Sequence, residues 1–105
     1  MRLKLTKMQT HLNDERRLEN KTNISARMKL NYCRLSRQKM ELNLLVIAED
    51  DFFQELFNVE LTYLLEETAL NDEKTVIAQA VTQLEPRIEL ILSMLTEEMG
   101  FELLS

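Results

Sequence analysis

The fold of this chain depends on how one apolar stretch is assigned: Leu42-Asn43-Leu44-Leu45-Val46-Ile47-Ala48. Asn43 is the only polar residue in this stretch, which is the longest nearly apolar run of the chain. It is much shorter than the roughly 20 apolar residues that cross a bilayer as a helix. Periodicity does not distinguish a buried strand from a buried helix in a run this short. The fold class must therefore be inferred from the rest of the chain.

The amino-acid composition favours helices. The 105 residues include a single glycine, Gly100, and a single proline, Pro86. Sheet proteins usually need Gly, Asn-Gly or Pro at their turns, whereas Leu, Met, Glu, Lys, Arg and Gln, which dominate here, are good helix formers. We therefore predict a mainly α fold in a single small helical domain, with at most a short two-stranded wing. Residues 1–70 would form a helix-turn-helix-like region and a central apolar helix, and residues 71–105 a C-terminal helix for packing or dimerisation.

Two apolar patterns support the central and C-terminal helices. After Asp50 and Asp51, either of which can cap a helix, a broad apolar stripe predicts a helix in the middle of the core. Its main members are Phe53, Leu56, Phe57, Leu61, Leu64 and Leu65. After Asn71-Asp72, apolar residues recur at alternating spacings of four and three, which is typical of a helix–helix seam, with a kink expected at Pro86. We predict a dimer or partner contact along Ile77, Val81, Leu84, Ile88, Ile91 and Leu95.

The charges divide along the chain. Residues 1–40 carry eleven Lys and Arg against three Asp and Glu, a net charge of +8, and residues 41–105 carry two against fifteen, a net charge of −13. A basic region beside an acidic one indicates an anionic partner for the first and self-repulsion or a basic partner for the second. Alternatively, the two regions neutralise each other across one fold.

The residue types argue against an enzyme. His11 is the only histidine and Cys33 the only cysteine, so a zinc site or an internal disulfide is not expected. A single glycine excludes the Gly-rich loops that cradle phosphates or dinucleotides. We therefore predict no catalytic residue, no metal, no cofactor and no small-molecule substrate. The N-terminal residues lack the apolar core of a signal peptide, so we expect a cytoplasmic protein without a membrane segment.

The first half of the chain resembles a known family of regulators. Lys21-Thr22 and Ile24, followed by Leu30-Asn31-Tyr32 and Leu35, are similar to the helix-turn-helix core of archaeal winged-helix DNA-binding regulators. The resemblance covers roughly residues 21–65 and implies a helix pair followed by a wing that starts near residues 44–46. Gln38 and Lys39 stand where that family has an aromatic and an aliphatic residue, and the Gly that usually precedes the wing is missing.

The resemblance and the charge pattern together lead to a functional hypothesis. If residues 31–42 are helical, Arg34, Arg37 and Gln38 share one face, where Arg can recognise guanine and Gln adenine. The predicted DNA-binding residues are Arg34, Arg37, Gln38, Lys39, Lys29, Arg27, Arg16 and Arg17, although all of them could be ordinary solvated residues. We predict a non-enzymatic, dimeric DNA-binding transcriptional regulator. The alternative is an acidic helical adaptor, antitoxin or inhibitor that binds a partner protein through residues 42–105.

Overall fold

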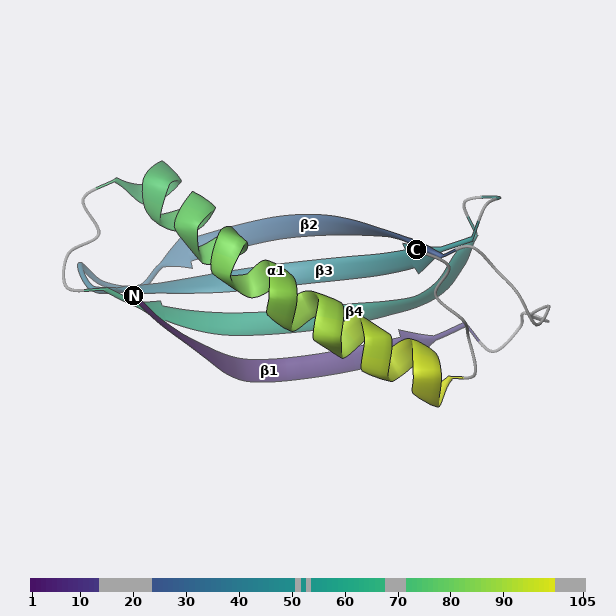
Figure 1. Cartoon of the computed structure of the whole chain (residues 1–105). Helices are drawn as coiled ribbons and strands as arrows, with labels where there is room; N and C mark the ends of the chain where they lie inside the picture. Colours follow the sequence, from purple (N-terminus) through teal and green to yellow (C-terminus); the bar gives the residue numbers. More distant parts are fainter. Residues whose placement is uncertain (14–23, 51, 53, 68–71, 100–105) are drawn as a thin grey trace.

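The chain folds into a four-stranded sheet with one long helix lying on it (Figure 1). The structure is a computed structural model and describes residues 1–13, 24–50, 52, 54–67 and 72–99. Its elements are β1 (Arg2–Leu12), β2 (Ser25–Arg34), β3 (Lys39–Glu49), β4 (Glu55–Glu66) and α1 (Glu73–Glu98). Because most of the described residues lie in strands, the predicted mainly α helical bundle was wrong.

All strand pairs are antiparallel, and the strand order is β1-β4-β3-β2. The order follows from two hairpins, β2–β3 and β3–β4, to which β1 adds on the far side of β4. Its pairing with β4 joins residues far apart in the sequence, such as Leu3 with Leu65. The two strands at the edges of the sheet are therefore β1 and β2.

The β3–β4 turn is built without glycine. Asp50 Oδ1 accepts hydrogen bonds from the backbone N–H groups of Phe52 at 2.9 Å and Gln54 at 3.0 Å. An Asp side chain that binds its own backbone in this way stabilises a turn as it stabilises a helix start. Asp50 therefore stabilises a turn between two strands, and the prediction that it caps a helix was wrong. The low glycine content did not exclude a sheet, because the Asp50 carboxylate accepts the hydrogen bonds that stabilise this turn.

The residues of β3 and β4 alternate between two faces. One face carries Met40, Leu42, Leu44, Val46 and Ala48 from β3, all 2% exposed or less. The facing residues of β4 are Phe57, Val59, Leu61, Tyr63 and Leu65, also 2% exposed or less. This alternation has the period of two that defines a strand. The apolar stretch 42–48 is therefore strand, and Asn43 lies on the opposite face.

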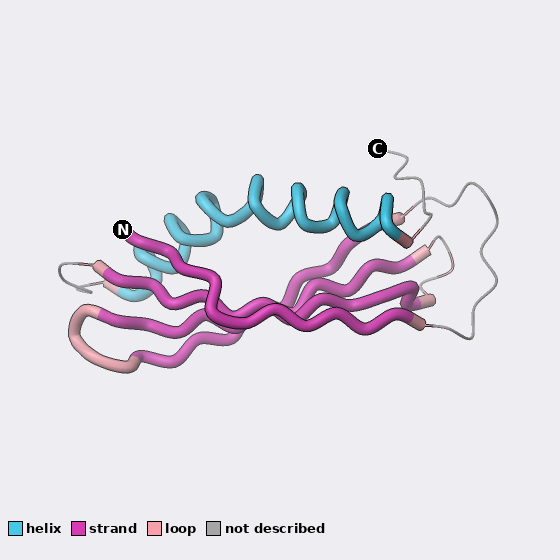
Figure 2. Tube along the Cα trace, turned by 90° about the horizontal axis from the view of Figure 1, so that it is seen from below, coloured by secondary structure: helices cyan, strands magenta, loops and turns pink. Residues whose placement is uncertain are grey.

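Helix α1 crosses one face of the sheet diagonally and leaves the other face, hereafter the open face, without a helix (Figures 1 and 2). Val76, Ala80, Leu84 and Ile88 recur every four residues and are at most 9% exposed, because this stripe packs on the sheet. Pro86 lies inside the helix on its exposed side. No helix in the described part of the chain combines the length and hydropathy that a membrane span requires.

In the described part of residues 21–65, strands and turns stand where a helix-turn-helix was predicted. Residues 25–34 are strand β2, and residues 35–38 are a turn. The segment that was expected to form the central apolar helix contains strand β4. Lys21 and Thr22, which opened the resemblance to the regulators, lie outside the described residues. Because Leu30, Asn31 and Tyr32 belong to a strand paired with β3, they cannot form the turn before a recognition helix.

A β-bulge explains why β1 has helical spacing. Leu5, Met8 and Leu12 recur at three and four residues, a spacing that is typical of an amphipathic helix. The register with β4 shifts between Leu5 and Lys7, so one extra residue is inserted there. The insertion returns Leu5 and Met8 to the same side of the strand, facing Tyr63 and Leu61. A strand with one bulge can therefore imitate the spacing of a helix.

Candidate functional site

The sheet presents two open edges. Within the described residues, β1 pairs only with β4 and β2 only with β3. Alternate backbone N–H and C=O groups along the outer side of each edge strand therefore lack a strand partner. Such an edge can accept an extended polypeptide as a further strand.

Apolar side chains line the edge strand β2 on the side of the helix. Met28, Leu30 and Tyr32 occupy successive positions on this side, opposite Val46, Leu44 and Leu42. Leu30 is half-buried against the core, whereas Met28 is 41% and Tyr32 49% exposed. Leu35, just after the strand, is 53% exposed. We call Met28, Leu30, Tyr32 and Leu35 the β2 row.

A second exposed apolar surface lies between β1 and the C-terminal half of α1. Arg87 Nη1 donates to the backbone oxygen of Leu3 at 3.3 Å, so this side of the helix faces β1. Leu90 and Met94 follow Arg87 at three- and four-residue spacing on the same helix side and are 66% and 55% exposed. With the half-exposed residues of β1, they form what we call the β1–α1 flank: Leu5, Met8, Leu12, Leu90 and Met94.

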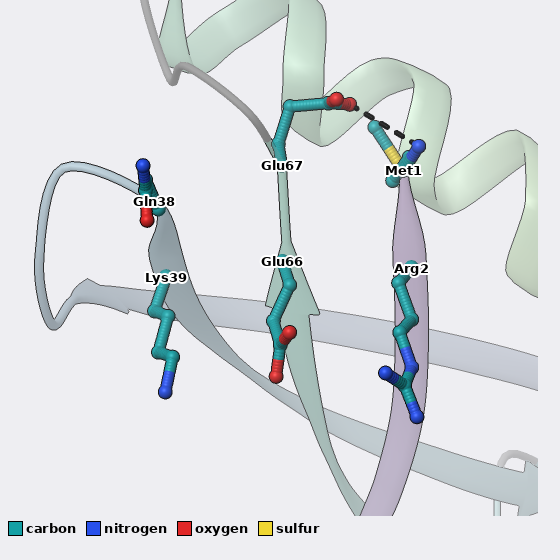
Figure 3. Close-up of a pocket in the computed structure, with 6 residues that line it drawn as sticks. All are labelled: Met1, Arg2, Gln38, Lys39, Glu66 and Glu67. Carbon is teal, nitrogen blue, oxygen red and sulfur yellow. Dashed lines mark ion pairs between the residues drawn. The ribbon is translucent and has the colours of Figure 1, made fainter.

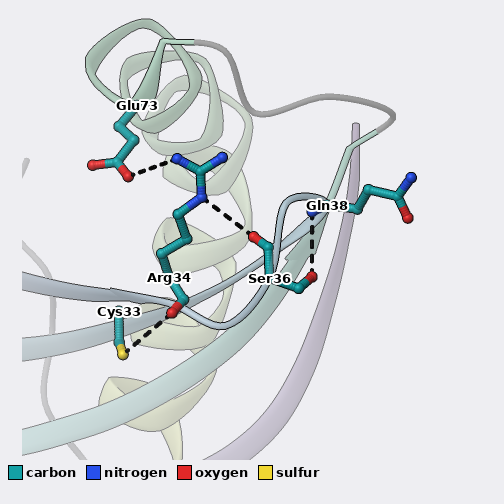
Figure 4. Close-up of polar contacts among 5 residues, drawn as sticks. All are labelled: Cys33, Arg34, Ser36, Gln38 and Glu73. Carbon is teal, nitrogen blue, oxygen red and sulfur yellow. Dashed lines mark hydrogen bonds and ion pairs between the residues drawn. The ribbon is translucent and has the colours of Figure 1, made fainter.

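Arg34 ties the end of β2 to the start of α1 (Figure 4). Its Nη1 lies 3.2 Å from Glu73 Oε1, and its Nε donates to the backbone oxygen of Ser36 at 3.3 Å. The backbone N–H of Gln38 donates to Ser36 Oγ at 3.2 Å, which closes the turn. This contact network positions the β2 row relative to the first turn of the helix. The exposed thiol of Cys33 lies 3.8 Å from the Arg34 backbone oxygen.

The pKa values of Tyr63 and Asp72 are shifted, and each shift has a structural cause. Burial in the core raises the pKa of the Tyr63 hydroxyl above its usual 10.0, which the charge of Arg87 partly offsets. At the start of α1, the Thr75 hydroxyl donates to Asp72 Oδ2 at 2.7 Å and lowers the pKa of that carboxyl. A carboxylate at a helix start also interacts favourably with the helix dipole.

A cavity of about 390 Å³ lies where β1, β4 and β3 meet the β2–β3 turn (Figure 3). Arg2, Glu66 and Lys39 are register neighbours on three adjacent strands and point in the same direction. On the other side of the cavity, Glu67 Oε2 lies 3.5 Å from the Met1 amine. Because positive and negative side chains alternate around it, this cavity is not complementary to a ligand of one charge.

The described residues include no cluster of three or more His, Cys, Asp or Glu that could hold a metal ion.

The arrangement of strands and helix is found in a solved structure. No protein-family model and no curated protein matches this sequence. The SecB-like chaperone Rv1957 of Mycobacterium tuberculosis, solved in complex with a ChAD peptide from the Rv1956 HigA1 antitoxin, is similar in structure, with a TM-score of 0.65 and 11% sequence identity. The similarity covers 100% of this chain and 85% of the chaperone chain. This chain has a SecB-like fold.

The SecB-like fold separates the residues that were predicted to bind DNA. Arg27 and Lys29 lie on the open face of β2, Arg34 lies on the helix side, and Arg27 is paired with the buried Glu49. Arg37 and Gln38 lie in the β2–β3 turn, Lys39 begins β3, and Arg16 and Arg17 lie outside the described residues. The DNA-binding helix-turn-helix prediction is therefore wrong, because the described members of this set lie on two strands and a turn rather than on one helix.

The predicted dimer seam packs largely within the same chain. Leu84 and Ile88 are buried against the sheet. Its other residues, Ile77, Val81, Ile91 and Leu95, are half-buried. The β2 row was not predicted, because the resemblance to the regulators implied a helix pair in the segment that holds Met28 and Tyr32. Their two-residue alternation with Arg27, Lys29 and Asn31 was a strand signal that could have identified this row.

Proposed function

We propose that this chain is a non-enzymatic binding protein that holds extended apolar segments of partner polypeptides along the β2 row. The observation that carries the proposal is the series Met28, Leu30 and Tyr32, with Leu35 beyond, beside the open backbone edge of β2. Partner proteins, rather than DNA, are the ligands that such a surface favours.

The spacing of the β2 row suits an extended ligand. Side chains on one face of a strand repeat every two residues, roughly 6.6 Å, both in β2 and in an extended peptide beside it. The backbone edge supplies hydrogen bonds that do not depend on ligand sequence, and alternate ligand side chains can contact the row. Methionine is adaptable and tyrosine combines an apolar ring with a polar hydroxyl, which suits ligands of varied sequence.

The structural similarity supports a protein-binding role. The protein with the similar fold is described as a chaperone and was solved with a peptide of an antitoxin. At 11% identity the similarity carries the fold and no individual contact, so the assignment to the β2 row rests on the exposure and register of its residues.

The proposal is tested with a fluorescein-labelled peptide in which leucine and serine alternate, titrated with the protein and followed by fluorescence anisotropy. The variant Tyr32→Glu places a carboxylate in the apolar row and should weaken binding about tenfold, because the charge must be desolvated. A peptide of the same composition with its leucines clustered should bind less tightly, since fewer of them face the row.

The matched control is His11→Glu, which changes the charge equally at an exposed position of the other edge strand, β1, on the open face. This control should bind like the wild type. Equal losses in both variants would assign the effect to net charge, and the absence of wild-type binding to the alternating peptide would refute the proposed function.

The exposed β1–α1 flank favours self-association as a second role. It combines the exposed side chains of Leu5, Leu12 and Leu90 with two methionines and an 11-residue edge strand. An antiparallel pair of identical edge strands is compatible with two-fold symmetry, in which one surface patch meets its copy. We propose that the chain forms a homodimer through this flank rather than through the apolar stripe that α1 buries against the sheet.

A further inference from the structure

The open face carries a polar cleft that the proposed β2 row does not use. The cleft has a volume of about 280 Å³ and includes side chains from all four strands. Its polar lining residues are Lys7, Thr62, Glu60, Asn43, Asn31 and Lys29. Lys7, Thr62, Asn43 and Asn31 are register neighbours in one row across the sheet, and Glu60 and Lys29 belong to the next row.

The strand order determines the charges of this cleft. The basic part of the sequence supplies β1 and β2, and the order β1-β4-β3-β2 places both at the edges. Lys7 and Lys29 therefore stand at opposite ends of the cleft. Neither lysine forms an ion pair with another described residue within 4.0 Å. The two ammonium groups are available to carboxylates of a ligand.

The middle of the cleft suits a neutral backbone. Thr62 Oγ1 donates to Asn43 Oδ1 at 3.0 Å, so the Asn43 oxygen is engaged while its two N–H donors remain for an acceptor. Glu60 can accept from N–H groups of a ligand. The backbone of a peptide offers C=O groups that can accept from Asn43 and N–H groups that can donate to Glu60. A peptide backbone therefore suits the middle of the cleft, between the two lysines.

A nucleic acid fits this face less well than an acidic polypeptide does. Glu41, Glu60 and Glu66 lie along the two central strands of the open face and would repel a continuous chain of phosphates. Tyr32, Phe57 and Tyr63, the Phe and Tyr residues of the four strands, all lie on the helix side, so the strands offer no Phe or Tyr ring for base stacking on the open face. Discrete carboxylates at the two edges avoid the central glutamates.

We propose that this cleft binds an acidic polypeptide segment that crosses the strands, with one carboxylate at Lys7 and another at Lys29. Lys7 on β1 and Lys29 on β2 are three strand spacings of about 4.8 Å apart across the sheet, and they are offset by two residues along the strands. Together these steps place their Cα atoms about 16 Å apart. An extended ligand covers this distance in roughly four to five residues. Its two acidic side chains point to the same side of the ligand, toward the sheet, only if they are an even number of residues apart. Acidic residues four positions apart are therefore the expected recognition pattern.

Binding is measured by fluorescence anisotropy with a labelled Gly/Ser peptide that has two glutamates four positions apart. The variant with both Lys7→Gln and Lys29→Gln should bind about tenfold more weakly than the wild type, because two charge-assisted contacts are lost. Binding should also weaken as salt is added. Circular dichroism checks that this variant is folded, as expected for substitutions of two exposed residues.

The matched control carries Lys4→Gln and Lys74→Gln, which remove the same charge from exposed positions outside the cleft, and it should bind like the wild type. A second peptide with two adjacent glutamates should bind more weakly than the first. Equal losses in both double variants, or equal binding of both peptides, would overturn the proposal. Tighter binding of a single-stranded oligothymidylate than of the first peptide would instead identify the face as a nucleic-acid site.

Discussion

Tyr63 is the residue at which the core becomes sensitive to alkaline pH. It is 2% exposed, and its pKa is raised above 10.0 because burial disfavours the phenolate. Between the ordinary and the raised pKa, the unfolded chain loses this proton before the folded chain does. Tyr63 therefore contributes its full stability below about pH 10 and loses it as the pH rises through the folded-state value.

This loss can be isolated with Tyr63→Phe, since all other groups titrate alike in both proteins. We expect the free energy of unfolding, measured by urea denaturation, to fall more steeply for the wild type than for the variant above about pH 10. Below that pH the difference between the two proteins should be constant. Parallel curves throughout would show that the Tyr63 hydroxyl has the same pKa in the folded and unfolded chain.

Helix α1 is stabilised chiefly by the stripe that it buries. Leu84, on the side of α1 that faces the sheet, is 0% exposed, whereas Leu90 on the same helix is 66% exposed. Leu84→Ala should lower the free energy of unfolding by about 2–5 kcal/mol, because it removes buried methyl groups and leaves a cavity. For the monomer, Leu90→Ala should change the free energy of unfolding by no more than about 0.5 kcal/mol, so both variants are compared at a protein concentration at which the chain is monomeric. Urea denaturation of the two variants provides the comparison.

This pair also tests the original dimer interpretation of the helix stripe. If Leu84 were a subunit contact, Leu84→Ala would weaken self-association and leave the stability of the monomer unchanged. The observed burial predicts the opposite result, a less stable chain at every protein concentration. If the urea midpoint of unfolding depended on protein concentration in the wild type and in Leu90→Ala but not in Leu84→Ala, the packing of α1 described above would be contradicted.

At the scale of the whole molecule, the two edges of the sheet are expected to have different roles. Leu5 on β1 and Met28 on β2 are both 41% exposed, so Lys substitutions at the two positions are closely comparable. If the β1–α1 flank forms a dimer, Leu5→Lys should weaken self-association about tenfold or more, and Met28→Lys should leave it unchanged. Analytical ultracentrifugation over a dilution series distinguishes these outcomes. A wild-type protein that is monomeric throughout the series would remove the homodimer proposal.

Local sequence patterns identified much of the core and misassigned its secondary structure. Leu56, Phe57, Leu61 and Leu65 were expected in the core and are at most 1% exposed, although they belong to a strand. Leu64, assigned to the same helical stripe, lies on the open face opposite Glu41. Burial follows from apolar side chains in either structure, whereas the choice between strand and helix depends on backbone partners elsewhere in the chain.

The candidate sites were predictable only in part. The separation of basic from acidic residues along the sequence indicated an anionic partner for residues 1–40, which stays a prediction. It did not indicate that Lys7 and Lys29 border one cleft, because two central strands separate them in the sheet. The β2 row was missed because Asn31 and Tyr32 fitted a motif whose helices do not form.

Which side chains are apolar enough for the core, and how charge is divided between residues 1–40 and 41–105, can be seen in the order of the residues alone. The folded arrangement was needed to establish that the stretch 42–48 is a strand, that α1 covers one face of the sheet and that the basic strands occupy both edges. The physical reason is that sheet hydrogen bonds join residues as distant as Leu3 and Leu65, so strand order is a property of non-local pairing.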